Sequence, residues 1–131
     1  MKGLVEDIEE LVEQNVDFRH VLYTGKHLQL VLMSLKPGEE IGDEVHKDRD
    51  QFFRIEKGHG QVVIDGKMHK IKDDDAILVP AGARHNVINT GDKALKLYTL
   101  YGPPNHIDQL IEVTKAEAVA SKEKFAGATT E

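Results

Sequence analysis

Short runs of β-type residues, separated by turn residues, fill most of this chain and constrain its fold more than any other feature. The runs lie between about Asp17 and Tyr101 and are rich in β-branched, aliphatic and aromatic side chains. They span residues 18–23, 28–36, 44–46, 51–57, 61–64, 68–71, 76–79, 85–89 and 95–101. Many short strands at close intervals predict a sandwich or a barrel rather than strands that alternate with helices.

Recognisable turn residues stand between these runs. Asp65-Gly66 separates two runs and predicts a tight hairpin, because glycine accepts the positive φ of a type I′ turn. Further breaks stand at Pro37-Gly38, Gly58-His59-Gly60 and Pro80-Ala81-Gly82, and Pro103-Pro104 ends the β region.

The segments on either side of the β region have helical patterns. Apolar residues recur at helical spacing among acidic residues near the N-terminus, which predicts a surface helix over about residues 3–14. Thr114 and Glu117 have the spacing of a capping box and predict a helix over about residues 114–124. A chain of 131 residues has the size of one domain, with the barrel over about residues 17–104.

Charge and composition exclude several classes of function. The net charge is -6 and no cluster of Lys and Arg appears, which argues against nucleic acid as a partner. The chain has no cysteine, so disulfides and thiolate metal sites are excluded. No apolar run is long enough to cross a membrane, and no basic and apolar leader opens the sequence. We therefore expect a cytoplasmic protein with no membrane or nucleic-acid partner.

Four polar residues in the β region form a candidate site. Glu44 and His46 are two positions apart on one predicted strand, so both side chains point to the same face. Gln51 shares the apolar, inward face of the next run, where a buried amide needs either a metal ion or a hydrogen-bond partner. His85 opens a later run.

The segments that contain these residues carry a family pattern. The first runs from Pro37-Gly38 through the four-residue gap between His46 and Gln51 to Gly58, and the second reads Pro80-x-Gly82-x-x-His85-x-x-x-Asn89. Together they resemble the paired motifs of the cupin superfamily, whose first motif contains His-x-His, four residues and Glu. The second motif matches at every marked position. The resemblance covers about residues 18–101 and implies an all-β jelly-roll barrel with a short helix at each end.

Residue by residue, the resemblance implies a metal site made of Glu44, His46, Gln51 and His85. The chain departs from the family at two of these positions, because Glu44 replaces the first His and Gln51 replaces the Glu. Two imidazoles with one carboxylate suit one divalent ion such as Fe(II), Mn(II), Ni(II) or Zn(II). Gln51 is a weaker, neutral ligand and could also be a hydrogen-bonded core residue, and Glu44 could also be an exposed strand-edge carboxylate.

For the function, the resemblance implies a metal-dependent enzyme that acts on a small, oxygen-rich anion such as a sugar acid or a dicarboxylate. The reaction would be of the isomerase, decarboxylase, lyase or dioxygenase type. The alternative is a non-catalytic module that binds a small molecule, with the metal vestigial or absent. The resemblance also implies a homodimer, for which Phe52 is a plausible contact.

The remaining polar and aromatic residues are expected outside the metal site. We expect Asn89 to bond a neighbouring turn and Tyr98 and Tyr101 to serve as core or interface residues. His59, His69 and Arg84 are expected on the surface, while His20 and His27 have no ligand partner at metal spacing. His106 follows Pro104-Asn105 and is not assigned to the site, although it could lie near the barrel mouth.

Overall fold

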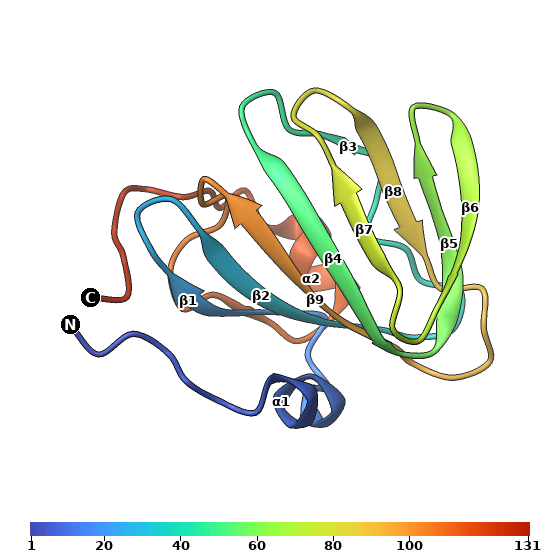
Figure 1. Ribbon diagram of the computed structural model, residues 1–131, viewed down its shortest axis with the longest axis horizontal. Coiled ribbons are helices and arrows are strands. Elements are labelled where there is room, and N and C mark those ends of the chain that lie inside the picture. Colours follow the sequence, from blue (N-terminus) through green and yellow to red (C-terminus); the bar gives the residue numbers. More distant parts are fainter.

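Two antiparallel β-sheets form the walls of the molecule (Figure 1). The computed structural model describes all residues, 1–131. The six-stranded sheet has the order β10-β1-β2-β9-β4-β7, and the four-stranded sheet has the order β3-β8-β5-β6. The elements in chain order are α1 (Ile8–Gln14), β1 (Arg19–Thr24), β2 (Gln29–Leu35), β3 (Glu44–Val45), β4 (Asp50–Lys57), β5 (His59–Ile64), β6 (Lys67–Lys72), β7 (Ala76–Val79), β8 (Arg84–Ile88), β9 (Leu95–Gly102), β10 (Ile111–Glu112) and α2 (Lys115–Ala120).

The core lies between the two sheets because the strands alternate inward and outward side chains. Strand β9 alternates along its whole length, with Leu95, Leu97, Thr99 and Tyr101 buried. The hydrophobic core of 17 residues draws on both sheets, for example Phe53 from the large sheet. The prediction of an all-β jelly-roll barrel is therefore confirmed, and all nine predicted strands are present within one or two residues at their ends.

Two positions in the four-stranded sheet, one in a turn and one on a strand, require glycine. Asp65 and Gly66 both have positive φ, as the predicted type I′ hairpin between β5 and β6 requires. At Gly60, on β5, a Cβ atom would lie 2.2 Å from the carbonyl oxygen of Ile88 on β8. The two backbones can approach this closely only because residue 60 has no side chain.

The helices are shorter than the sequence predicts. The N-terminal helix begins at Ile8 rather than at residue 3, because the Asp7 carboxylate accepts a hydrogen bond from the Glu10 amide and caps it there. The C-terminal helix begins after Thr114 as predicted, with the Thr114 hydroxyl accepting from the Glu117 amide. It ends at Ala120, however, and not at residue 124.

Strand β10 was not predicted from the sequence. It is only two residues long, so it has no run in which inward and outward residues could alternate. It pairs with β1, where Arg19 lies opposite Glu112. Through this pairing the segment after β9 returns to the large sheet and carries α2 against the barrel.

Two further expectations concern the surface. Phe52 lies on the outer face of the large sheet beside Leu78, which is 68% exposed, and Leu100, its cross-strand neighbours. The homodimer stays a prediction.

No helix is long and apolar enough to span a membrane.

Candidate metal centre

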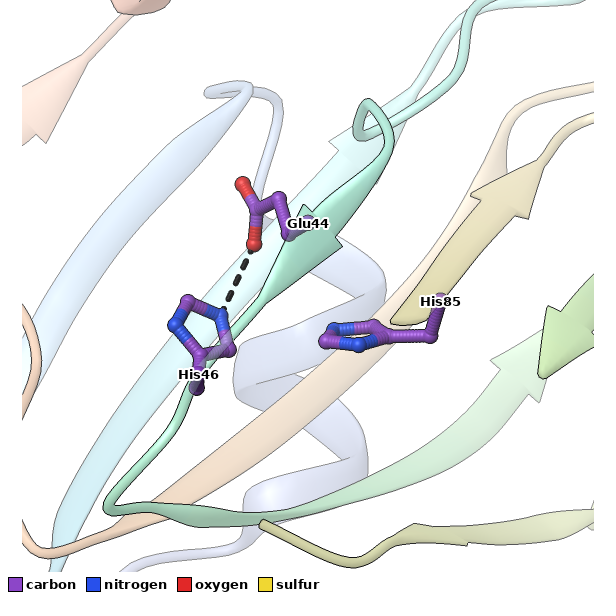
Figure 2. Close-up of side chains that lie close together, drawn as sticks. All are labelled: Glu44, His46 and His85. Atoms are coloured by element: carbon purple, nitrogen blue, oxygen red, sulfur yellow. Dashed lines mark hydrogen bonds and ion pairs between the residues drawn. The ribbon is translucent and has the colours of Figure 1, made fainter. Parts of the chain in front are cut away.

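The four predicted site residues come from three strands, or their ends, that face one another inside the barrel. Glu44 on β3 lies directly opposite His85 on β8 in the small sheet. His46 follows β3 by one residue, and Gln51 reaches in from β4 in the large sheet. Figure 2 shows Glu44, His46 and His85 pointing toward a common centre. The structure thus brings together all four residues that the motifs singled out.

The distances between the polar atoms are short. Nε2 of His46 lies 2.9 Å from Oε2 of Glu44, and Nε2 of His85 lies 3.0 Å from Oε1 of Gln51. One ligand atom each from Glu44, His46 and His85 all lie within 4.8 Å of one another. The first two separations are those of hydrogen bonds, and two donor atoms about 2.1 Å from one tetrahedral metal ion are only slightly farther apart, at about 3.4 Å. Small side-chain movements would therefore suffice for one ion to contact these atoms.

The hydrogen bonds around Gln51 fix which of its atoms faces His85. The Thr99 hydroxyl donates to the Phe52 carbonyl, so its oxygen is left to accept a hydrogen bond from Nε2 of Gln51. The Gln51 side chain is 1% exposed, and its Oε1 therefore faces Nε2 of His85. Nδ1 of His85 in turn faces the carbonyl oxygen of Ala83 at 3.2 Å.

Both ring nitrogens of His85 thus face hydrogen-bond acceptors. A neutral imidazole has only one N–H. In one of these two contacts, the lone pair of a ring nitrogen would therefore face the lone pair of an oxygen. Protonation of the ring would satisfy both contacts, but burial lowers the pKa of His85. A cation that accepts lone pairs from Nε2 of His85 and Oε1 of Gln51 satisfies both atoms while Nδ1–H donates to Ala83.

The ionisation states also suit a metal ion. Burial of the Glu44 carboxyl acts to raise its pKa, but the hydrogen bond and charge of His46, together with the charge of Arg19, outweigh it and hold the pKa below its ordinary value. Glu44 is therefore anionic near neutral pH, and His85 is neutral. One carboxylate, two imidazoles and one amide oxygen are a donor set for a divalent first-row metal ion, so the residues present fit such an ion.

A chain of three further polar residues ends at this centre. Tyr101 lies opposite Gln51 on the neighbouring strand, and its ring meets the His46 ring edge-on at 5.7 Å between centroids. Nε2 of His106 lies 3.1 Å from the Tyr101 hydroxyl, and Nδ1 of His106 lies 2.9 Å from Oε2 of Glu123. Because a carboxylate only accepts, Nδ1 of His106 donates to Glu123.

No motif or spacing in the sequence predicts this series of contacts. His106 is buried and contacts the Tyr101 hydroxyl, and no motif in the sequence assigns it to the site. Tyr101 is a core residue as predicted, but it also contacts the site. Burial raises the pKa of Tyr101 and keeps its phenol neutral. Glu123 lies 17 residues from His106, a separation that no short motif covers.

The other polar residues lie where the sequence placed them. Asn89 bonds its own turn, because its amide donates to the Leu35 and Lys93 carbonyls and its oxygen accepts from the Gly91 amide. His27, His59, His69 and Arg84 are exposed, while His20 is half-buried and belongs to no potential metal-binding group.

Known proteins share this fold and much of this sequence. The sequence model of the cupin domain family matches residues 31–101 of this chain. Protein YrkC of Bacillus subtilis is 50% identical over 93% of this chain and 69% of its own length. The crystal structure of BH2720 from Bacillus halodurans, 44% identical, covers 92% of this chain and 96% of that chain, with a TM-score of 0.90.

A more distant solved structure is that of a protein with an activity in its name. It is a predicted oxalate decarboxylase from Thermotoga maritima, 27% identical, and the likeness covers 60% of this chain and 68% of that one with a TM-score of 0.58. The family match and the high identity to YrkC agree with the motifs and with the barrel. This chain belongs to the cupin family.

Proposed function

We propose that this chain binds one divalent metal ion through Glu44, His46, Gln51 and His85 and acts as a metal-dependent enzyme on a small, oxygen-rich anion. The observation that carries the proposal is the arrangement around His85, where two hydrogen-bond acceptors face a buried neutral ring. A metal ion satisfies this arrangement, and it favours Gln51 as a direct ligand rather than a core residue.

A bound ion would act as a Lewis acid toward a carboxylate or a carbonyl–hydroxyl pair. The chain's own residues contribute the rest. Glu44 supplies one negative charge, which leaves a divalent site net positive and suited to an anion. The Tyr101 hydroxyl is held in place by His106 and Glu123 beside the His46 ring. The likeness to a predicted oxalate decarboxylase supports a small carboxylate as the ligand.

The test is a calorimetric titration of Zn(II) and Mn(II) into chelator-treated protein over a range of pH. We expect about one ion per chain at pH 7.5. Because burial holds the pKa of His85 below its ordinary value of 6.5, the ring is neutral at pH 7 and affinity is full there. Affinity falls as the pH drops through that lowered pKa, by up to about tenfold per pH unit for each proton that the site takes up.

The rival function makes the opposite prediction. A non-catalytic module with no functional metal site would take up neither ion at micromolar concentration at any pH. A stoichiometric uptake that does not change between pH 7.5 and pH 5 would also contradict the proposed ligands, because imidazoles must lose their protons to bind metal.

A further inference from the structure

A small pocket of about 160 Å³ lies beside the candidate metal centre. Glu44 forms part of its wall, so the pocket and the centre share a residue. The other walls come from the start of β1, the segment before β3 and the helix α2. Two cations, Arg19 and Lys115, line it.

Arg19 is a buried cation with an unused donor. Its side chain is 7% exposed and forms an ion pair of 2.7 Å between Nη1 and Oε1 of Glu112. Its Nε atom is buried and has no hydrogen-bond partner. Arg19 is two residues from the core residue Val21 on β1, so it shares the inward face of that strand, and it lines the same pocket as Glu44. A buried donor without a partner is costly, and an oxygen ligand in the pocket could satisfy it.

Lys115 is the first residue of α2 and also lines the pocket. Its ammonium group donates to the carbonyls of Glu40 and Ile41 at 2.6 and 2.8 Å, which leaves one of its three donors. Both cations stack on Phe18, because Lys115 Nζ and the Arg19 guanidinium carbon each lie 5.4 Å from the ring centroid. Burial lowers the pKa of Lys115, as expected for a partly desolvated ammonium group.

Arg19 and Lys115 bring two positive charges to a pocket whose lining contains one carboxylate, Glu44, while Glu112 pairs with Arg19. A divalent ion beside Glu44 would add positive charge next to this pocket. We propose that the pocket binds the second carboxylate of a small dicarboxylate whose first carboxylate lies at the metal. Arg19 and Lys115 are then the residues that select a dianion over a monoanion. The inference rests on the proposed metal site and narrows its substrate class.

The test compares dicarboxylates with monocarboxylates on Zn(II)-loaded protein. We titrate three dicarboxylates, oxalate, malonate and succinate, into the native chain and into the Lys115→Met variant. Acetate and propionate serve as the monocarboxylate controls. We expect at least one dicarboxylate to bind about tenfold or more tightly than acetate, and Lys115→Met to remove most of that advantage. Acetate affinity and zinc content should not change.

Matched variants separate recognition from folding. Lys122→Met removes the same charge from an exposed position and should bind like the native chain. Lys115→Arg should restore part of the dicarboxylate preference, and thermal unfolding shows whether each variant keeps its fold. The double variant Arg19→Met/Glu112→Leu removes the guanidinium without leaving a lone buried charge, and it should also lose the preference.

Two results would overturn the inference. One is a zinc-loaded native chain that binds every dicarboxylate no better than acetate. The other is a folded, zinc-loaded Lys115→Met variant that keeps the native preference. A native chain that takes up no metal would overturn this inference together with the proposed function, and the zinc content measured before each titration distinguishes that case.

Discussion

The His85→Ala variant is expected to bind Zn(II) more than about a hundredfold more weakly than the native chain. His85 is one of the two imidazoles in the candidate site, and β8 contributes no other residue to the group that could hold a metal ion. The measurement is a competition titration with a chromophoric chelator at pH 7.5. His46, at the end of β3, is less buried than His85. His46→Ala should weaken zinc binding to the same extent.

The control for these variants is His69→Ala. His69 is an exposed histidine on β6 with no place in the centre, so its replacement should leave zinc affinity within about twofold of native. If His85→Ala and His46→Ala both fold and still bind zinc as His69→Ala does, the ligand assignment is wrong.

The second large effect concerns stability. The Glu112→Leu variant is expected to lose about 3–5 kcal/mol of unfolding free energy, because it leaves the Arg19 charge buried without its counter-ion. Guanidinium chloride unfolding of metal-free protein measures the loss. The double variant Arg19→Met/Glu112→Leu should recover most of it, since replacing both members of a buried pair by apolar residues is often neutral.

An exposed ion pair provides the comparison for this prediction. Arg84 and Asp43 lie 2.8 Å apart, but their side chains are 63% and 58% exposed. Asp43→Ala should cost less than about 1 kcal/mol, because solvent screens such pairs. Equal losses of unfolding free energy in Asp43→Ala and Glu112→Leu would show that the Arg19–Glu112 pair is no more shielded from solvent than the exposed pair.

The barrel could be predicted because its signals are local. The alternation of inward and outward residues identifies β9. The turn at Asp65-Gly66 requires only that its two residues adopt positive φ. Strand β10 could not be predicted, since its two residues are held by pairing with β1 and not by a pattern of their own. The start of α1 is set by the Asp7 cap, whereas the apolar spacing alone extended the predicted helix to residue 3.

The candidate site likewise contains residues that local spacing predicts and residues that only the folded chain brings together. Glu44 and His46 share a face because they are two apart, and the second motif singled out His85. Gln51 was ambiguous in the sequence, and its direction became clear only through Thr99, which lies on another strand. His106–Glu123 depends on the path of the chain after β9, which no spacing records.

The central claim is that one divalent ion lies between the two sheets, and anomalous diffraction from crystals grown with Zn(II) tests it most directly. The account predicts one dominant peak per chain about 2.0–2.2 Å from Nε2 of His46, Nε2 of His85 and a carboxylate oxygen of Glu44, with Oε1 of Gln51 as the fourth ligand. A barrel with no peak, while zinc binds only at surface histidines such as His59 or His69, would contradict it.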